Sequence, residues 1–380
     1  MKTAKRLIAG LGLILAAVLF PAGPAAQGAN WLEVTGPCGF QFPKDHGPHP
    51  GYRLEWWYYT GNLKGPGQEP YGFQVTIFRT QMSPPGGENG LPNRPSAWRT
   101  KQLYFGHAAV SDIRAGRFVF AERMARGALG LAGAEQKEKE TRIFIKPWEI
   151  VIGETAHQLF AVHPSFTIDL SLTPLKPLVA HGRQGYSQKG ARPESASCYY
   201  SFSRLGAAGV LKIGGRSVPV KGTAWMDHEY STAMLEPEVV GWDWFSLDLS
   251  NSAELMIFLL RRRDGSLTPA SSGTLIPAFG PAVHLSSGEF KVEVLGRWKS
   301  PHSGGVYPSG WRIRSAAHGL DLVLRPNLED QELRTPASTR VTYWEGSVSI
   351  TGRTGQGTVE GQGYVELTGY ARSVQGITKP

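Results

Sequence analysis

The sequence predicts an all-β protein made of two related barrel-like halves, and three observations lead to this fold class. Glycine is frequent, with 47 of 380 residues, and aromatic residues make up 11% of the chain. Many turns together with aromatic and β-branched runs favour short strands over helices. The third observation is an internal repeat of four segments in the same order. Short strands without βαβ alternation remove their exposed edges by closing into a barrel or stacking as a sandwich.

The first 29 residues indicate export. Three basic residues precede the apolar run 7–20, and the stretch 21–29 is rich in Pro, Ala and Gly. This order is typical of a secretory signal, and an apolar run of 14 residues is short for a membrane span. We expect a cleaved signal peptide over 1–29 and a periplasmic or secreted mature chain. A retained N-terminal anchor stays open as the alternative.

Charge and cysteine content narrow the classes of partner. Without the three basic residues of 1–29, the formal net charge falls from +9 to +6. The other basic residues are scattered apart from the run 261–263, so we expect no nucleic-acid partner. Weak peripheral attraction to an anionic membrane surface stays open. Cys38 and Cys198 could pair in an oxidising compartment, but two thiols cannot form a disulfide scaffold, so the core must be hydrophobic.

The strand pattern of the first half is readable element by element. The segments 54–63 and 71–80 are rich in aromatic and β-branched residues, and the glycines between them predict a hairpin. The segment 81–95 is a Pro-, Gly- and Asn-rich loop, and 103–110 predicts another strand. Apolar residues at helical spacing predict a helix over 121–134.

The second half repeats the first with shorter connections. The matched segments are 56–63 with 242–249, 75–79 with 257–261, 169–174 with 321–326, and 222–227 with 361–366. The offset falls from 186 to 182, 152 and 139, as expected if the first copy carries loop insertions. We therefore place one domain at 36–235 and the other at 236–376.

The aromatic start of the first half carries a carboxylate. Period-two geometry places Glu55, Trp57 and Tyr59 on one face of a strand. If that face lines a barrel, Glu55 lies near the mouth, where desolvation would raise its pKa and suit it to donate a proton. The same pattern is explained if Glu55 is solvated at the start of the strand and the aromatic residues after it belong to the core.

A second candidate is the run of ionisable residues that ends the first repeat. Alternation places Asp227 and Glu229 on one face, and His228 and Tyr230 on the other. A bend in the strand would bring a carboxylate and the imidazole together as an acid–base pair. Capping or solvated roles fit as well, and the match of Asp227 with Glu366 favours a structural role for that carboxylate.

A third candidate opens the second repeat. Trp242 and Trp244 flank Asp243, which fits the wall of an apolar ligand pocket but also plain core packing. His107, alone in its predicted strand, is a weaker candidate. The chain lacks a Gly-x-Ser-x-Gly elbow, the second histidine of a zinc-protease helix, a Walker-type loop and a Cys/His ligand cluster. These absences disfavour serine hydrolases, zinc proteases and nucleotide enzymes, and we expect no cofactor and no metal.

Five motifs in combination resemble the AttH/CrtC family: Glu55–Tyr58, Gly106–Ala108, Asp227–Ser231, Gly241–Trp244 and Gly363–Tyr370. The resemblance runs over about 36–373 and implies two lipocalin-like barrels. The family contains carotenoid 1,2-hydratases, which add water to a terminal double bond without a redox cofactor. It also contains AttH-like predicted secreted hydrolases, which are associated with an ABC-transporter system.

One motif separates these two branches. The hydratases carry Asp-His-Asn-Trp where this chain has Asp-His-Glu-Tyr at 227–230. A tyrosine stabilises a carbocation less well than an indole, which argues against carotenoid hydration. The signal peptide and the Trp-rich start fit the AttH-like secreted branch better.

The sequence therefore predicts a lipocalin-like AttH-type protein that binds a hydrophobic or amphipathic, lipid-like molecule at the interdomain cleft. Whether it is catalytic stays open. A hydratase or hydrolase would use Asp227, His228, Glu229 and Glu55 as acid–base residues. The expected ligand walls are Trp57, Tyr59, His107, Tyr230, Trp242, Asp243 and Trp244. The alternatives are a non-enzymatic carrier or accessory component of an ABC permease, and a carotenoid hydratase proper.

Overall fold

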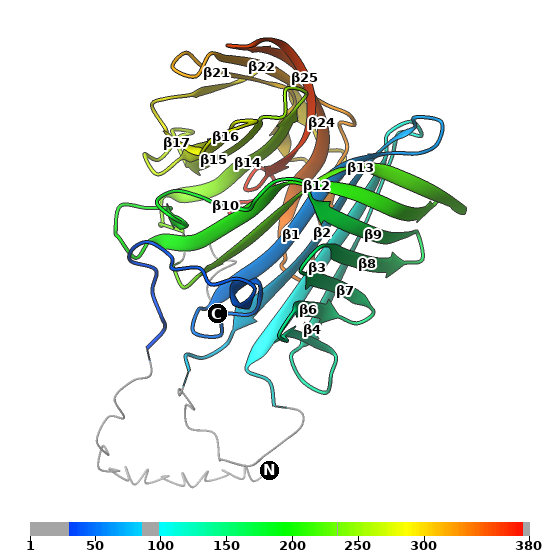
Figure 1. The fold of residues 1–380 in the computed structure, drawn as a ribbon, viewed down its shortest axis with the longest axis vertical. Helices are drawn as coiled ribbons and strands as arrows, with labels where there is room; N and C mark the ends of the chain where they lie inside the picture. The colour runs from blue at the N-terminus through cyan, green and yellow to red at the C-terminus, as the bar shows by residue number, and fades with distance from the viewer. Residues whose placement is uncertain (1–29, 86–98, 234, 375–380) are drawn as a thin grey trace, which may run out of the picture.

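The computed structural model describes residues 30–85, 99–233 and 235–374, which form two β-barrels packed side by side (Figure 1). The predicted signal peptide 1–29 and much of the predicted loop 81–95 lie outside these residues. In the described part, the one helical element is a single 3-10 turn, η1 (Lys44–His46). None of the described helical structure is long and apolar enough to cross a membrane. The all-β fold class is confirmed.

The first barrel is a 13-stranded antiparallel sheet with the order β4-β3-β2-β1-β13-β12-β9-β8-β7-β6-β5, to which β10 and β11 add at β12. Its strands are β1 (Leu54–Lys64), β2 (Pro70–Gln81), β3 (Gln102–Asp112), β4 (Arg117–Arg126), β5 (Ala132–Gln136), β6 (Glu140–Ile145), β7 (Trp148–Gly153), β8 (His157–His163), β9 (Phe166–Pro174), β10 (Val179–Ala180), β11 (Tyr186–Gln188), β12 (Ala196–Ile213) and β13 (Arg216–Ser231). Residues of β4 and β6 come into contact, so the sheet nearly closes.

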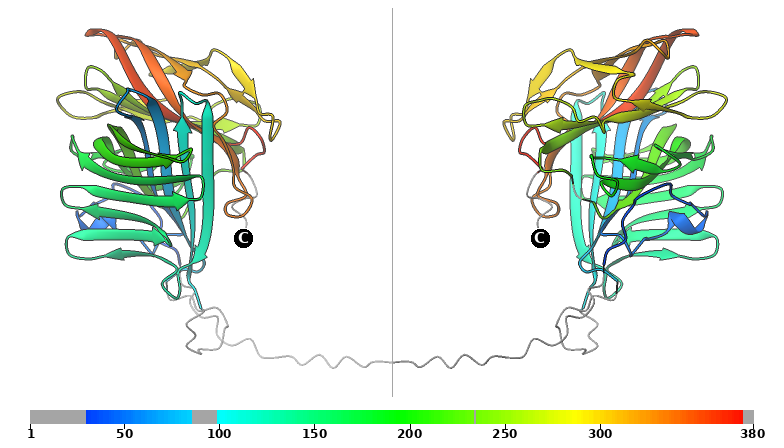
Figure 2. Two further views of the ribbon diagram at one scale, coloured as in Figure 1. Left: turned by 90° about the vertical axis from the view of Figure 1, so that its right-hand side faces the viewer. Right: turned by 90° about the vertical axis from the view of Figure 1, so that its left-hand side faces the viewer.

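The second barrel repeats this order with fewer strands. Its 10-stranded sheet runs β17-β16-β15-β14-β25-β24-β22-β21-β18, with β23 paired to β24 and a separate β19-β20 ribbon. The strands are β14 (Val239–Leu249), β15 (Glu254–Arg262), β16 (Ser272–Ile276), β17 (Val283–Ser286), β18 (Lys291–Val294), β19 (Arg297–Lys299), β20 (Val306–Pro308), β21 (Trp311–Ser315), β22 (Leu320–Pro326), β23 (Glu332–Arg334), β24 (Thr342–Thr354) and β25 (Gly357–Leu367). Figure 2 shows the two barrels from both sides.

Strand order and register both support the predicted duplication. The repeats found in the sequence fall on β1 and β14, β2 and β15, β9 and β22, and β13 and β25. Trp57 lies opposite His228 in the first barrel. Their counterparts at the same offsets, Asp243 and Leu367, lie opposite each other in the second.

A pair of glycines gives independent support for the duplication. A Cβ on Gly222 would lie 2.0 Å from the carbonyl oxygen of Asn62, and a Cβ on its counterpart Gly361 would lie 2.4 Å from that of Asp248. Both copies therefore keep glycine where two backbones approach closely.

Alternation along the strands creates three apolar layers. Trp57, Tyr59 and Leu63 of β1 point into the core of the first barrel. Phe245 and Leu247 of β14 belong to the core of the second. The outward-facing aromatic residues of both barrels meet in a third cluster, which we call the seam and which contains Tyr58, Tyr199, Trp225, Trp244 and Tyr364.

The helix predicted over 121–134 is wrong. The segment forms the end of β4, a turn and the start of β5. Two of the residues at helical spacing, Met124 and Leu131, are largely exposed, so they mark no buried helical face. Ala121 instead pairs with Ala108 of β3. The backbone of this segment hydrogen-bonds to β3, and this tertiary pairing cannot be predicted from local propensity.

Candidate functional site

Strand β13 divides the predicted site residues between two places. Asp227 accepts a hydrogen bond from Tyr199 at the seam. His228 contacts Glu55 inside the first barrel. The strand pairs with β1 in an unbroken register at this point, so adjacent side chains point to opposite faces. The Asp227–His228 pair expected from a bent strand therefore does not form.

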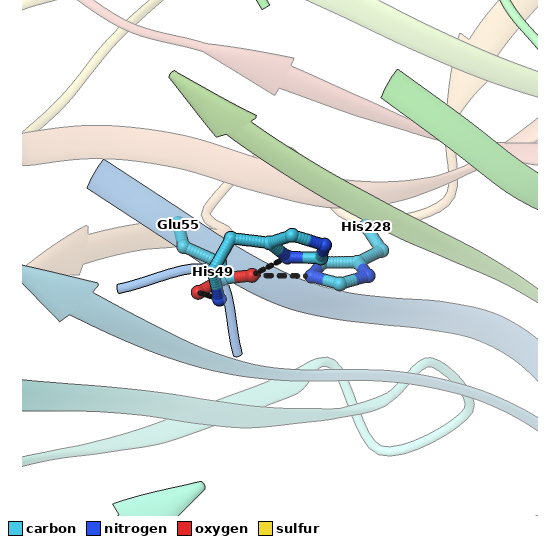
Figure 3. Close-up of side chains that lie close together, drawn as sticks. All are labelled: His49, Glu55 and His228. Atoms are coloured by element: carbon cyan, nitrogen blue, oxygen red, sulfur yellow. Dashed lines mark hydrogen bonds and ion pairs between the residues drawn. The ribbon is translucent and has the colours of Figure 1, made fainter. Parts of the chain in front are cut away.

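The first place is the end of the first barrel that the segment before β1 covers, where polar side chains surround Glu55 (Figure 3). Glu55 Oε1 lies 2.7 Å from His49 Nδ1 and 2.9 Å from His228 Nε2. The other oxygen, Oε2, accepts a hydrogen bond of 2.7 Å from Arg79 Nε. We call Asp45, His49, Glu55, Arg79 and His228 the mouth cluster. Glu55, Arg79 and His228 have fully buried side chains, whereas that of His49 is 15% exposed.

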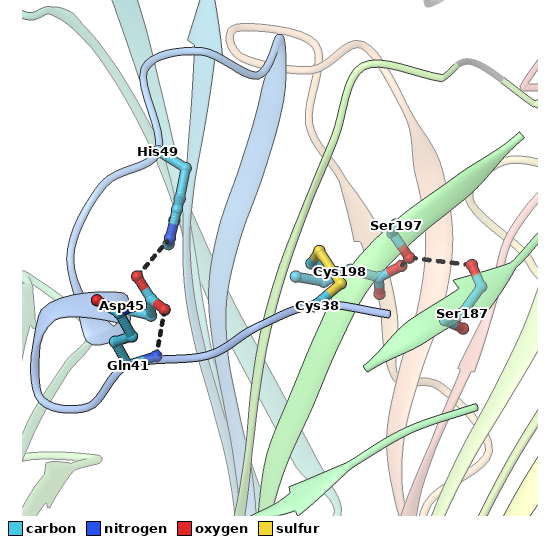
Figure 4. Close-up of a disulfide and its surroundings, with 8 residues drawn as sticks. Cys38, Gln41, Asp45, His49, Ser187, Ser197 and Cys198 are labelled. Atoms are coloured by element: carbon cyan, nitrogen blue, oxygen red, sulfur yellow. Dashed lines mark hydrogen bonds and ion pairs between the residues drawn. A yellow bond between two sulfur atoms is a disulfide. The ribbon is translucent and has the colours of Figure 1, made fainter. Parts of the chain in front are cut away.

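The segment before β1 closes this end of the barrel. Arg79 Nη2 donates to the carbonyl oxygens of His49 and Tyr52, at 2.7 and 3.1 Å. Cys38 and Cys198 form a disulfide that ties the same segment to β12 (Figure 4). The pairing that the sequence left open is thus present, and it fixes the segment that carries Asp45 and His49.

Electrostatics make the mouth cluster an ion-pair network. Burial raises the pKa of Glu55, but hydrogen bonds from His228 and His49 and the charge of Arg79 outweigh it and hold that pKa well below its usual range. The raised pKa expected for Glu55 is therefore wrong. Burial lowers the pKa of His49, but the carboxylates of Asp45 and Glu55 produce a net rise. Burial lowers the pKa of His228, with Glu55 opposing.

The second place is the seam, where Asp227 is held by three donors. Tyr199 Oη donates to Oδ2 at 2.7 Å. Trp225 Nε1 donates to Oδ1 at 2.5 Å, and the Ser201 hydroxyl donates to the same oxygen. Trp244 Nε1 donates to Tyr199 Oη at 3.1 Å, which extends the network across to the second barrel.

Two further carboxyl groups reach the seam from the second barrel. Tyr58 Oη donates to Glu345 Oε1 at 2.6 Å, and Trp242 Nε1 donates to Glu366 Oε2 at 3.1 Å. The Tyr58 ring meets Trp244 edge-on at 5.1 Å between centroids. Trp242 and Glu366 are only partly buried, so the seam is accessible from solvent at this end.

The seam carboxyls are poised to hold protons near neutral pH. Burial raises the pKa of Asp227 to about 7, against hydrogen bonds from Ser201, Tyr199 and Trp225. Burial also raises the pKa of Glu366 to about 7, with the charge of Asp227 adding to it. The pKa of Glu345 is raised well above its usual value, by burial first and by the charge of Glu366 second.

The other predicted acids have ionic partners. Glu229 lies 3.3 Å from Lys189 Nζ, which also lies 3.7 Å from the centroid of the Phe258 ring. Asp243 accepts hydrogen bonds from Arg261 Nε at 2.8 Å and Tyr370 Oη at 3.0 Å.

Several of the residues predicted to line a ligand pocket lie inside the first barrel. Trp57 stacks on His228 with centroids 4.8 Å apart. Tyr59 Oη lies 2.9 Å from His157 Nδ1. Tyr230 stacks on His49 at 3.7 Å, at the barrel mouth. Of the expected walls, Trp242 and Trp244 belong to the seam, whereas Asp243 lies on the opposite face of β14, beside Arg261 at the end of the second barrel.

His107 connects the two barrels. Its Nδ1 lies 2.8 Å from Tyr343 Oη, and its Nε2 lies 2.9 Å from Ser338 Oγ. Ser338 also donates to Glu122 at 2.5 Å. Burial lowers the pKa of His107 to about 3, so the ring is neutral. His107 thus links β3 of the first barrel to β24 and to the loop that precedes β24 in the second.

A small hollow lies further along the seam, with a volume of about 20 Å³, room for a single water molecule. It is lined by Thr60, Gly61, Asn62, Ser203, Thr223, Ala224, Trp225, Ser246, Leu247, Asp248, Gln362, Gly363 and Tyr364. Thr60 Oγ1 and Tyr364 Oη, both buried, have no hydrogen-bond partner among the described residues. The hollow is thus too small for any ligand larger than water.

Sequence reasoning missed Asp45, His49, Arg79 and Glu345, and it named Glu366 only as the repeat counterpart of Asp227. Arg79 carried a signal, because a charged residue closes an otherwise apolar run and recurs as Arg261. His49 lies in a Pro-, Gly- and His-rich stretch without periodicity, and the turn that brings it back to Glu55, six residues later, has no periodic signal in the sequence. Glu345 and the chemical role of Glu366 depend on which strands of the second barrel face the first.

Comparisons with known proteins agree with this architecture. The model of the AttH-like family matches residues 33–370. The crystal structure of a candidate AttH from Nitrosomonas europaea shares 33% identity at a TM-score of 0.79, covering 89% of this chain and 99% of that one. Kievitone hydratase from Nectria haematococca (16% identity, TM-score 0.63, 91% and 97% covered) and CghA with Sch210972 (12%, 0.53, 88% and 94%) share the fold. A search of curated proteins found no match. The chain belongs to the AttH-like family.

Proposed function

We propose that this AttH-like chain is an acid–base enzyme of the hydratase type, acting on a hydrophobic or amphipathic molecule at the partly exposed end of the seam. One observation carries the proposal: Asp227, Glu345 and Glu366 converge from both barrels on a wall of tyrosine and tryptophan rings. Carboxyl groups that keep a proton near neutral pH are the groups that general acid catalysis needs.

Glu366 is the proton donor in this scheme, because it combines a pKa of about 7 with partial exposure. Its proton moves to one carbon of a substrate double bond, and the π-face of Trp242 stabilises the cation left on the other carbon. Water then forms the new carbon–oxygen bond. The proton that this water loses returns to the carboxylate of Glu366, directly or through Asp227, so the acid is restored.

Two further considerations support the proposal. Kievitone hydratase, which shares the fold, is a hydratase by name. The export signal predicted over 1–29 would place the activity in the periplasm, where a lipid-like substrate and an ABC permease partner would be met. In this scheme Glu55 and His228 do not touch the substrate, because they point into the first barrel.

Oxygen incorporation tests the proposal. The protein is incubated with a lipid extract of its host in heavy-oxygen water, and products are sought by mass spectrometry. We expect Glu366→Gln to lower incorporation by about 10²-fold or more, the usual share of a general acid, and Asp227→Asn to lower it as well. Glu360→Gln on the same strand and Asp169→Asn are matched controls, because both residues are exposed.

A carrier would give a different result. If wild-type protein retains a stoichiometric lipid in native mass spectrometry but incorporates no oxygen, the chain binds without catalysis and the enzyme proposal fails. Incorporation that survives in Glu366→Gln at the level of Glu360→Gln also contradicts it.

A further inference from the structure

We propose that the mouth of the first barrel is a binding site for a divalent transition-metal ion such as Zn²⁺, with His49, Glu55 and His228 as ligands. One donor atom from each of the three residues lies within 4.8 Å of the other two. Two imidazoles and one carboxylate make up a ligand set that Zn²⁺ uses in proteins, with a fourth position left for water or substrate. This site is separate from the seam and does not depend on the proposed function.

Two of the donors, His49 and Glu55, lie six residues apart in the sequence, whereas His228 comes from a distant strand. His49 lies in the segment before β1, Glu55 on β1 and His228 on β13. The two histidine nitrogens approach the same oxygen, Glu55 Oε1, at 2.7 and 2.9 Å. Ligands 2.0–2.2 Å from a tetrahedral ion lie about 3.4 Å apart. Outward movements of less than about 1 Å would therefore admit an ion between the three donors.

The atom of each ligand that points away from this centre already has a partner. His49 Nε2 lies 3.4 Å from Asp45 Oδ1. His228 Nδ1 lies 2.9 Å from Tyr200 Oη. Glu55 Oε2 accepts from Arg79 at 2.7 Å. Outer partners of this kind fix the tautomer and orientation of metal-ligating side chains.

The second barrel shows that packing alone does not require these ligands. At the positions that correspond to Glu55 and His228 it has Gly241 and Leu367, although it keeps the arginine as Arg261. The disulfide between Cys38 and Cys198 holds the segment of His49 against the first barrel. The described residues of the second barrel contain no such disulfide. Of the two barrel ends, the first is therefore the one equipped with convergent donors.

Access and charge are also compatible with an ion. The side chains of His49 and Asp45 are each 15% exposed, so the centre is reachable from the N-terminal segment. With both histidines neutral, as metal ligands must be, the carboxylates of Asp45 and Glu55 and the guanidinium of Arg79 leave one net negative charge. Tyr230, stacked on His49, forms an apolar wall beside the open coordination position.

Metal titration of the disulfide-intact chain tests the site. The protein is stripped with a chelator and titrated with Zn²⁺ by calorimetry, and Co²⁺ is added separately for its absorption spectrum. We expect one ion per chain and a tetrahedral Co²⁺ spectrum. Asp45→Asn should weaken Zn²⁺ affinity about 10–100-fold, as loss of an outer partner does, and His49→Ala should weaken it more.

The matched control is His302→Ala. His302 also pairs with an aspartate, Asp330 at 2.8 Å, but it lies on an exposed surface of the second barrel. This variant should bind Zn²⁺ like the wild type. His49 lies outside the strands, so His49→Ala should keep the wild-type far-UV circular dichroism. Wild-type protein that takes up no ion, or a His49→Ala variant with unchanged affinity, would overturn the site and leave the seam proposal untouched.

Discussion

Each barrel has an arginine at the equivalent position of one end, and the two arginines pair with different carboxylates. Arg79 of β2 lies opposite Glu55, and its counterpart Arg261 of β15 lies opposite Gly241. In the first barrel the carboxylate is Glu55 itself. In the second it is Asp243, which occupies the position of Trp57.

In both copies the arginine also holds the chain segment that covers the barrel end. Arg79 donates to the carbonyl oxygens of His49 and Tyr52 in the N-terminal segment. Arg261 donates to that of Thr368 and lies 3.7 Å from the centroid of the Tyr370 ring, both in the C-terminal segment. The arginine therefore belongs to the architecture of the repeat, whereas Glu55 and His228 have no equivalents at the corresponding positions of the second copy, which are Gly241 and Leu367.

The largest expected difference concerns these two arginines. Arg79→Leu should lower the free energy of unfolding by about 3–5 kcal/mol, because it leaves the buried carboxylate of Glu55 without its guanidinium. Arg261→Leu should cost about 1–3 kcal/mol, since its side chain is 14% exposed, water reaches the site, and Tyr370 still donates to Asp243.

Urea unfolding of both variants measures this difference. The m-value should stay unchanged, so that the shift in midpoint reports stability alone. Equal losses in the two variants would break the comparison, because the first mouth would then be no more dependent on its ion pair than the second.

The next effect concerns the seam and depends on pH. The pKa of Glu366 is about 7 in the folded chain, against an ordinary glutamate value of 4.5, which we take for the unfolded chain. The folded state keeps its proton while the unfolded state loses it, so stability falls as pH rises from about 4.5 to 7. The full shift corresponds to about 3 kcal/mol, and partial exposure of Glu366 reduces it.

Glu366→Gln should remove the part of the slope that Glu366 contributes, whereas Asp227, with a pKa also raised to about 7, keeps its own part. Its stability relative to the wild type should rise across that pH range, measured by urea unfolding at about pH 4.5, 6 and 8. Glu360→Gln, an exposed position on the same strand, should follow the wild type. Parallel curves for the wild type and Glu366→Gln would mean that Glu366 is ionised throughout and cannot act as the acid.

The fold class could be predicted well because both of its signals, period-two alternation and the internal repeat, can be read from the sequence without knowing any tertiary contact. Segments 54–63, 71–80 and 103–110 appear as β1, β2 and β3, and the matched repeats fall on corresponding strands. The helix over 121–134 failed because a sheet edge supplied hydrogen bonds that local spacing cannot anticipate.

The strand faces on which the candidate residues lie were predicted, but the way these residues group in space was not. Alternation correctly separated Asp227 from His228, yet the expected meeting of the two required a bend that β13 does not have. His49 could not be found, because its approach to Glu55 depends on a loop held by Arg79 and by a disulfide between cysteines 160 residues apart in sequence. The low pKa of Glu55 depends on the same long-range partners.

The smallest expected effect lies on the outer surfaces, where the two copies should not differ. Arg312 in the second barrel binds Asp321 through two hydrogen bonds of 2.8 and 2.7 Å, with both side chains 41% exposed. Arg142 pairs with Glu149 in the first, at similar exposure. Arg312→Ala and Arg142→Ala should each cost less than about 1 kcal/mol, since solvent screens exposed pairs. Thermal unfolding at low and high salt measures both. A loss of unfolding free energy above about 2 kcal/mol in either variant would mean that the two barrels also differ in their surface ion pairs. Two small, salt-sensitive losses would confine the difference in stability to the buried ion pairs at the barrel ends.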